Sequence, residues 1–319
     1  MRFFSVIIPM YNREKLIGRA IRSCLNQVFA DFEVIVVDDG STDKSVETVL
    51  EFTDPRIRLI RHETNQERLI ARNTGAKAAR GQWLIWLDSD DELVPGALAV
   101  IKKRAGELPP DVLGMRFRCR LDSGRISPDP PYCDEEWDYE TFIRWIESHH
   151  SKLGETLPVV HRRTTSTVLF PADKFYTGEM QYHLDFAAKY KIRSYTDILR
   201  IYHRDAYNNT SSSSVEKRLI SAPAVASRLE SVIASHGEGL IKWAPRTYYR
   251  TVGGIITQHL ISGHRQKAFR VFLRTMVITP FRPKIWAIFA IGIIDQRLLA
   301  YAMTYKDKIA IEAGRSQSR

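Results

Sequence analysis

Four acidic residues follow directly on an apolar segment, and their types and spacing are suited to binding a divalent metal. The segment Trp83–Leu87 is apolar on both faces, which predicts a buried strand. Open α/β sheets place their ligands at the carboxyl ends of such strands. Crowded carboxylates repel one another, and Mg²⁺ or Mn²⁺ relieves this repulsion while sharing its oxygen shell with substrate phosphates. Asp88 and Asp90 are therefore the first candidate metal ligands and Asp91 the next; the alternative is an acidic N-cap on a helix with Pro95 in its first turn.

The segments before this strand predict an alternation of strands and helices. Strands are expected at Phe3–Pro9, from Phe32, and at Ile57–Arg61, with amphipathic helices ending near Gln27, after Ser41, and within Asn65–Ala79. This order favours an α/β fold with a doubly wound, mostly parallel sheet flanked by helices. No Gly-x-Gly-x-x-Gly follows the first strand and no Gly-Lys-Ser/Thr occurs, which disfavours dinucleotide-binding and P-loop proteins.

The charge of the chain is unevenly distributed. The 319 residues carry a net charge of +10, and the 104 positions 216–319 hold 17 Lys and Arg against 6 Asp and Glu. The first 215 residues are close to neutral. An excess of cations confined to one region is typical of proteins that contact nucleic acid or an anionic membrane surface.

Cysteine spacing and hydropathy indicate the compartment. Cys24, Cys119 and Cys133 lie far apart without a Cys-x-x-Cys pair, which argues against both a disulfide framework and a zinc site. No signal-peptide pattern precedes the first strand, and the longest apolar run, Ile285–Ile294, is too short to span a bilayer. We expect a cytoplasmic protein.

Four motifs carry a resemblance to a known family. They are Ser-Val-Ile-Ile-Pro-Met-Tyr-Asn from Ser5, Val-Asp-Asp-Gly-Ser-Thr-Asp from Val37, Ala-Arg-Asn-Thr-Gly from Ala71, and Asp-Ser-Asp-Asp from Asp88. In this order and spacing they resemble the family 2 glycosyltransferases of GT-A fold. The resemblance is close over roughly the first 100 residues and weakens toward Val215. It implies a GT-A, Rossmann-like catalytic domain. The serine run Ser211–Ser214 suggests a flexible link, so we expect this domain at 1–215 and a basic helical region at 216–319.

The resemblance implies a nucleotide-sugar donor and assigns residues to it. Pro9 and Tyr11 would line a shelf for the nucleobase, and Asp39 would bond the base or ribose. Arg72 would reach the nucleotide from its helix, and Asp88 would serve both the donor and the metal. The alternatives are that Asp39 belongs only to a turn and N-cap, and that Arg72 is a solvated helix charge.

The resemblance also implies inversion, which needs a carboxylate base for the acceptor hydroxyl. In similar enzymes this is an aspartate in a Glu-Asp pair that opens a late helix. The pair is not intact here: one alignment puts Glu179 on the base position, and a shift by one puts Met180 there. Glu179 is the preferred catalytic candidate, and Asp185 is a weaker one.

Other polar and aromatic residues are weaker candidates. His203 and Arg204 could touch the diphosphate or metal, although their position as charged residues flanking a strand is the preferred explanation. Acceptor specificity is expected in the insert from Pro109 to Pro171, where the helical spacing of Phe142 and Trp145 also predicts core packing. The histidines of this insert, His149, His150 and His161, are too irregularly spaced for a metal site.

The basic region reads as helical, with Phe269, Phe272 and Leu273 among its cations. Such helices suit the plane of an anionic membrane surface, and the alternative is a helical pair packed on the catalytic domain or at a dimer interface. Nucleic acid is disfavoured because no recognised binding motif accompanies the charge.

Together these features predict an inverting, metal-dependent glycosyltransferase that uses Mn²⁺ or Mg²⁺ and a nucleotide sugar, most commonly a UDP-sugar, although GDP and dTDP donors remain open. Its acceptor would be a glycan or lipid-linked glycan in surface polysaccharide or lipopolysaccharide synthesis, at the inner face of the cell membrane. The rival hypotheses are a sugar-nucleotide-binding protein that has lost its base and a metal-dependent nucleotidyltransferase.

Overall fold

The computed structural model describes residues 2–129, 133–148, 154–172, 179–203, 215–278, 283–295, 297 and 299–305. The strands are β1 (Phe4–Met10), β2 (Phe32–Asp38), β3 (Ile57–Arg61), β4 (Trp83–Trp86), β5 (Glu92–Leu93), β6 (Val112–Leu121), β7 (Ile126–Ser127), β8 (Glu135–Trp137), β9 (Thr156–His161) and β10 (Lys191–Tyr202). The helices are α1 (Ile17–Leu25), α2 (Ser45–Leu50), α3 (Arg68–Ala78), α4 (Ala97–Gly106), α5 (Tyr139–Ser148), α6 (Glu179–Ala187), α7 (Val215–Trp243), α8 (Pro245–Ile261), α9 (Arg265–Ile278) and α10 (Pro283–Ile294), with a 3₁₀ helix at Arg162–Ser166.

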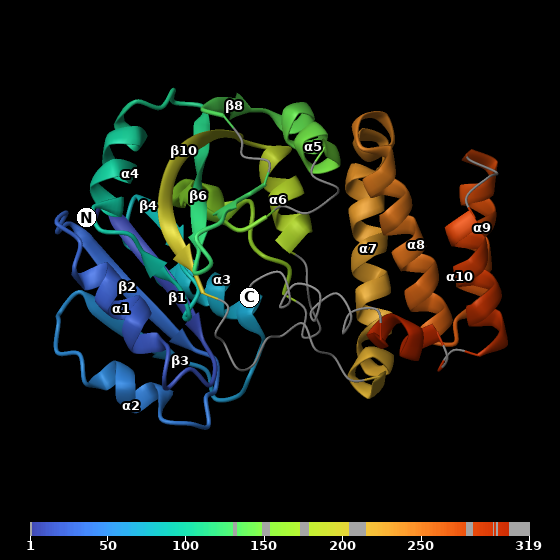
Figure 1. The fold of residues 1–319 in the computed structure, drawn as a ribbon, viewed down its shortest axis with the longest axis horizontal. Helices are drawn as coiled ribbons and strands as arrows, with labels where there is room; N and C mark the ends of the chain where they lie inside the picture. Colours follow the sequence, from blue (N-terminus) through green and yellow to red (C-terminus); the bar gives the residue numbers. More distant parts are fainter. Residues whose placement is uncertain are drawn as a thin grey trace. The chain divides into compact units, whose positions relative to one another are not determined.

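The chain divides into two compact units. The first comprises Met1–Trp145, Ser151–Lys174 and Gly178–Ala206, and the second comprises the remaining residues, chiefly Tyr207–Arg319. The first unit contains one mixed sheet, and the second contains α7 to α10 (Figure 1). The predicted α/β fold with a helical C-terminal region is confirmed.

The sheet has the strand order β3-β2-β1-β4-β9-β6-β10-β5, with β7 beside β6 and β8 beside β10. Strands β1 to β4 are mutually parallel, as the alternation of strands and helices predicted. Beyond β4 the pairs β4–β9, β6–β9 and β10–β5 are antiparallel, and only β10 pairs with β6 in parallel. Strands β2 and β3 lie on one side of β1, and β4 lies on the other. The strand order therefore reverses between β1 and β4, which is the switch point where such sheets bind ligands.

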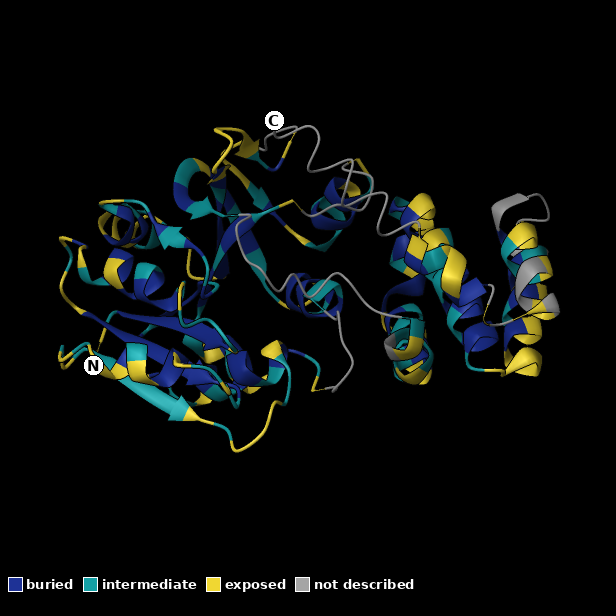
Figure 2. Cartoon of the chain, turned by 60° about the horizontal axis from the view of Figure 1, so that its bottom comes forward, coloured by how far each residue is buried: buried dark blue, intermediate teal, exposed yellow. Residues whose placement is uncertain are grey.

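The central strands are buried because apolar side chains cover both of their faces. All residues of β1, β2 and β4 are buried (Figure 2). Helix α3 approaches the sheet closely at Gly75, where a Cβ atom would lie 2.5 Å from the side chain of Ile7. A residue with a side chain would push the helix outward, so this glycine sets the height of α3 above the strand ends.

The aromatic residues of the insert are packed in the core of the first unit. Trp137 and Phe142 are fully buried, and the rings of Trp137 and Trp145 stack with their centroids 5.1 Å apart. The prediction of core packing from their helical spacing is confirmed.

In the second unit, α8 packs against α7, α9 and α10. Helices α9 and α10 are joined by aromatic stacking, with the rings of Phe272 and Phe289 4.4 Å apart. No helix in the described part of the chain combines the length and the apolar character needed to cross a membrane.

Candidate active site

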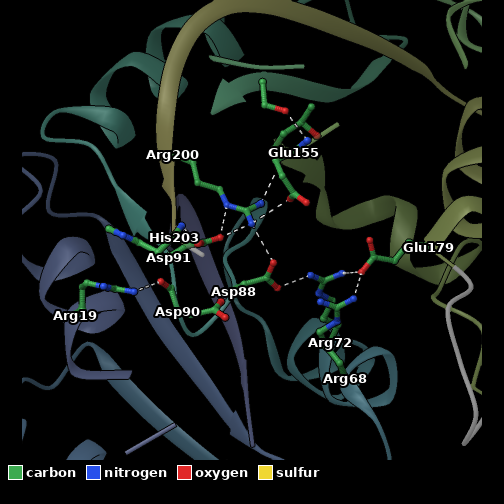
Figure 3. Close-up of polar contacts among 12 residues, drawn as sticks. Arg19, Arg68, Arg72, Asp88, Asp90, Asp91, Glu155, Glu179, Arg200 and His203 are labelled. Carbon is green, nitrogen blue, oxygen red and sulfur yellow. Dashed lines mark hydrogen bonds and ion pairs between the residues drawn. The ribbon is translucent and has the colours of Figure 1, made fainter. Parts of the chain in front are cut away.

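The acidic loop after β4 lies at the switch point of the sheet and directs its carboxylates to different partners (Figure 3). Asp88 accepts a hydrogen bond from Arg72 Nη2 on Oδ1 at 2.6 Å and one from Arg200 Nη2 on Oδ2 at 3.1 Å. Burial by itself raises the pKa of Asp88, but the charges of Arg72 and Arg200 outweigh burial and hold that pKa well below its usual range. Asp88 is therefore ionised and held between two guanidinium groups.

Asp91 is fully buried and belongs to an ion pair with Arg200. Arg200 Nε donates to Asp91 Oδ2 at 2.6 Å, and the backbone N–H of His203 donates to Asp91 Oδ1 at 3.0 Å. Burial raises the pKa of Asp91 to about 7 against the opposing charge of Arg200, and Asp88 adds to the rise. Arg200 also donates to the carbonyl of Thr156 at 2.9 Å, so the pair ties β10 to β9 and to the loop after β4.

Asp90 forms no hydrogen bond or ion pair with Arg72 or Arg200 (Figure 3). Its carbonyl oxygen accepts from Arg19 Nη2 at 2.5 Å, whereas no side chain in the described ranges hydrogen-bonds to its carboxylate. Burial and the neighbouring charge of Asp88 raise the pKa of Asp90. A bound cation would relieve both effects, so this carboxylate is the best placed of the three to meet a ligand.

Glu179 reaches the same cluster from the first residue of α6. Its Oε1 accepts from Arg72 Nη1 at 2.8 Å and from Arg68 Nη2 at 2.7 Å, so the Arg72 guanidinium bridges Glu179 and Asp88 (Figure 3). Burial by itself raises the pKa of Glu179, but Arg72 and Arg68 outweigh it and lower that pKa. The N-terminal position on a helix also favours the negative charge.

The second base candidate, Asp185, lies elsewhere. It follows Glu179 by six residues on α6, about 9 Å along the helix axis. Burial raises the pKa of Tyr139 in α5, and the charge of Asp185 adds to this rise. The structure thus brings Glu179, and not Asp185, to the arginines that contact the acidic loop. Met180 is the second residue of α6.

The loop after β2 forms a second polar cluster around Asp39. Asp39 Oδ1 accepts from the backbone N–H of Gln66 at 2.9 Å and lies 2.8 Å from His62 Nδ1. Because a carboxylate only accepts, Nδ1 of His62 carries the proton, and Nε2 lies 3.0 Å from the hydroxyl of Thr74 in α3. Asp39 Oδ2 is buried and has no hydrogen-bond partner among the described residues. This oxygen is free to accept from a ligand.

The backbone next to Asp39 packs closely against the segment between β3 and α3. Gly40 has φ +75°, and a Cβ atom there would lie 2.8 Å from the backbone of Thr64 and Asn65. Asp38 is fully buried and accepts from the backbone N–H of Ser41 at 3.1 Å, which gives it a structural role in the turn. At the end of β1, Pro9 is buried in the strand and Tyr11 is exposed.

Sequence reasoning missed Arg200, His62, Arg68 and Glu155. Glu155 lies next to β9, and its Oε2 is 3.6 Å from Arg200 Nη2. The sequence contains one indication that Arg200 is buried in an ion pair. It is the cation in the otherwise apolar stretch Ile198–Ile201, where a charged side chain needs a buried partner. The roles of His62, Arg68 and Glu155 could not be predicted, because they depend on which distant segments come together in the folded chain.

Two histidines considered as candidates in the sequence, His203 and His161, form hydrogen bonds with protein groups. His203 Nε2 lies 2.7 Å from Glu92 Oε1, and His161 Nδ1 accepts from the backbone N–H of Arg163 at 3.2 Å. Arg204, His149 and His150 lie outside the described residues.

No group of three or more His, Cys, Asp or Glu side chains converges on a metal position within the described ranges. A nucleotide-bound Mg²⁺ or Mn²⁺ needs only one or two carboxylates, since phosphates and water complete its shell. Asp90, whose carboxylate no side chain of the described ranges hydrogen-bonds, fits that requirement. Asp88 accepts from Arg72 and Arg200 on its two oxygens, but its side chain is partly exposed and each oxygen keeps a further lone pair for a ligand. Asp91 would first have to give up Arg200 and the His203 N–H.

Comparisons with known proteins decide the family. The sequence model described as glycosyl transferase family 2 matches residues 5–209. The chain belongs to glycosyl transferase family 2. Its motifs at Asp39, Arg72 and Asp88 lie within the matched range.

The similar proteins include enzymes of defined reaction. Over 87 residues the chain is 45% identical to UDP-Glc:alpha-D-GlcNAc-diphosphoundecaprenol beta-1,3-glucosyltransferase WfgD of Escherichia coli, covering 27% of this chain and 34% of that protein. The match thus spans about a third of the length of that relative.

Two solved structures share the fold. Staphylococcus aureus TarS (residues 1–349) in complex with UDP-GlcNAc superimposes with a TM-score of 0.60 at 18% identity, covering 96% of this chain and 92% of that one. The mannosyltransferase PcManGT of Pyrobaculum calidifontis, in complex with GDP-Man and Mn²⁺, gives a TM-score of 0.54 at 18% identity, covering 97% and 88%.

Proposed function

We propose that this glycosyl transferase family 2 chain transfers a sugar from a nucleoside-diphosphate donor to a lipid-linked glycan with inversion at the anomeric carbon. The observation that carries the proposal is the Arg72 guanidinium, which joins the carboxylates of Asp88 and Glu179 at the carboxyl ends of the strands. The names of the relatives support the substrate classes, since WfgD acts on a diphosphoundecaprenol-linked sugar with UDP-Glc and TarS was solved with UDP-GlcNAc.

The nucleoside would bind beside β1 and β2. The unpartnered Oδ2 of Asp39 would accept a hydrogen bond from the base or ribose, with its other oxygen held by His62 and Gln66. Tyr11, exposed at the end of β1, would lie along the base, with Pro9 beneath it in the strand.

Asp88 and Asp90 would hold Mn²⁺ or Mg²⁺, which supplies charge stabilisation for the departing nucleoside diphosphate. Arg72 keeps Asp88 ionised and oriented. The PcManGT complex with GDP-Man and Mn²⁺ supports a metal in a protein of this fold. We leave Asp91 out of this set because its side chain is fully buried against Arg200 and the His203 N–H, whereas the Asp88 side chain is partly exposed.

Glu179 would be the general base. Its ionised carboxylate accepts the proton of the acceptor hydroxyl as that oxygen attacks the anomeric carbon from the face opposite the diphosphate. The bond between that carbon and the phosphate oxygen breaks, and the electron pair leaves with the nucleoside diphosphate. Burial raises the pKa of Glu179, but the charges of Arg72 and Arg68 outweigh burial, so the carboxylate is ionised before the acceptor binds.

The helical region after residue 215 would place the enzyme at an anionic membrane surface on the cytoplasmic side, as a unit separate from a catalytic domain at 1–215. Helix α9 contains four Lys and Arg and no acid, and Phe269 and Leu273 are each 47% exposed on it. Such a surface suits a protein whose acceptor is anchored in lipid.

The test is turnover with UDP-, GDP- and dTDP-sugars, with Mn²⁺ or Mg²⁺ and a lipid-diphosphate-linked sugar as acceptor, followed by NMR of the product anomer. We expect one donor class to be used, with inverted configuration and loss of activity in EDTA. Asp90→Ala should abolish metal-dependent turnover. Nucleotide binding without turnover for every donor and acceptor would favour the binding protein instead.

A further inference from the structure

The residue after Arg72 holds the backbone of a single residue, Phe170, with two hydrogen bonds. Asn73 is buried in α3, and its Nδ2 donates to the carbonyl oxygen of Phe170 at 2.7 Å. Its Oδ1 accepts from the backbone N–H of the same Phe170 at 2.9 Å. Both polar groups of one backbone residue outside the sheet are thus satisfied by one amide side chain.

The ring of Phe170 connects three parts of the active site. It stacks on Tyr182 of α6 with the centroids 3.9 Å apart, and it meets Trp86 of β4 edge-on at 5.3 Å. The Arg72 guanidinium lies 5.4 Å from the same ring, a favourable cation–π distance. Fixing the Phe170 backbone therefore fixes a surface on which Arg72 and α6 both rest.

Tyr182 lies one turn after Glu179 on α6, so the two side chains project on neighbouring positions of the same helix face. The stacking of Tyr182 on Phe170 sets the distance of this face from α3, where Arg72 and Arg68 meet Glu179. A separate contact, Arg116 Nη2 to His183 Nδ1 at 2.8 Å, holds the helix from β6. Loss of the Phe170 contact would shift α6 and leave that second contact in place.

We propose that Asn73 is a positioning residue that, through Phe170 and Tyr182, holds the first turn of α6 so that the Glu179 carboxylate meets Arg72. The inference rests on the proposed function only in the use of Glu179 as the base. The position of α6 itself depends on the contacts alone.

Four charged groups influence Glu179 from the surrounding elements: Arg68 and Arg72 on α3, Asp88 after β4, and Glu155 next to β9. Moving Glu179 away from the two arginines weakens the attraction and leaves the two carboxylates acting on it. Its pKa then rises.

The experiment measures the titration of the Glu179 carboxyl carbon by NMR in glutamate-labelled wild-type protein and in Asn73→Ala, with the signal assigned by Glu179→Gln. We expect the pKa of Glu179 to be higher in Asn73→Ala. For transfer, kcat should fall about tenfold to a hundredfold while the donor KM changes little, because the loss is one of alignment. Asn26→Ala, a replacement at an exposed position after α1, is the matched control and should change neither value.

Phe170→Leu is the second variant, since it keeps an apolar side chain and removes the stacking. Phe170→Leu should also raise the pKa of Glu179. The double variant should raise this pKa little further, because both replacements act through the same Phe170–Tyr182 contact. If Asn73→Ala does not fold, the titration of Glu179 in Phe170→Leu tests the proposal by itself. An unchanged Glu179 titration in a folded variant overturns the proposal and leaves Asn73 a purely stabilising residue. A raised pKa in a protein whose wild type transfers no sugar would keep the proposal and reject the proposed function.

Discussion

Arg200 Nε lies 2.6 Å from Asp91 Oδ2, and both side chains are buried in a strand-end cluster that joins β10 to the loop after β4. Removing one partner of such a pair leaves an uncompensated charge in the protein interior. We expect Arg200→Ala to lower the free energy of unfolding by about 3–5 kcal/mol. Chemical denaturation measures the change.

The control for this prediction is Arg125→Ala. Arg125 and Asp129 form an exposed pair at 3.2 Å, so its loss should change the free energy of unfolding by less than about 1 kcal/mol. Equal effects of the two replacements would contradict the role given to Arg200.

Glu33 gives the fold a pH dependence. It is buried in β2, where its carboxylate accepts from Ser5 Oγ at 2.7 Å and Arg58 Nη1 at 2.8 Å. Burial raises its pKa, but the bonds from Arg58, the Arg80 N–H and Ser5 outweigh burial and lower that pKa. A carboxylate with a lowered folded-state pKa stabilises the fold above its unfolded pKa, and this contribution disappears as the pH falls through the folded value.

We therefore expect Glu33→Gln to destabilise the protein by about 2 kcal/mol near neutral pH. The difference from wild type should shrink below about pH 4, the ordinary range of a glutamate. Urea denaturation at several pH values measures it. A difference that grows toward low pH would contradict the assigned direction.

Asp39→Asn tests the nucleoside site. The amide replaces one acceptor oxygen by a donor, so a ligand group that donates to Asp39 loses its partner. We expect the affinity for the matching nucleoside diphosphate to fall about tenfold to a hundredfold, which corresponds to about 1.4–2.8 kcal/mol. Calorimetry with UDP, GDP and dTDP measures the change and identifies the base. Asp54→Asn, in a surface pair with Arg56, should bind as wild type does.

The proposed contact of α9 with an anionic membrane can be tested with vesicles. Replacing Phe269 and Leu273 by Ser, or Arg270 and Arg274 by Glu, should each reduce co-sedimentation with vesicles that contain anionic phosphatidylglycerol. Binding of wild type should weaken with salt, since the attraction is partly electrostatic. Equal binding of wild type and both variants would point to a packing or oligomer interface instead.

Much of the first unit could be predicted because local patterns determine it. The segment Ile57–Arg61 is a strand as expected. Asp38 is the last residue of the buried strand β2, and Asp88 follows the buried strand β4. The antiparallel pairing of β9 with β4 and β6 depends on contacts between segments distant in sequence, and no periodicity encodes such pairing.

The candidate site likewise contains residues that local sequence predicts and residues that only the folded chain brings together. The motifs predicted Asp39, Arg72, Asp88 and Asp90 as candidates, because each lies at a turn or helix with a recognisable local sequence. The partners of these residues came from elsewhere: Arg200 lies 112 positions from Asp88, and Glu179 lies 107 positions from Arg72. Only the folded chain shows that Arg72 joins the acidic loop to the first turn of α6.

The most direct test of the account compares sugar transfer by Glu179→Gln and Asp185→Asn, with donor binding measured in parallel. Glu179→Gln keeps the size of the side chain and removes its basic oxygen. We expect its transfer rate to fall about 10²–10⁴-fold with nearly unchanged donor affinity. Asp185→Asn, on the same helix but away from Arg72, should transfer close to the wild-type rate. Wild-type transfer by Glu179→Gln, or loss of transfer only in Asp185→Asn, would contradict the assignment of the base.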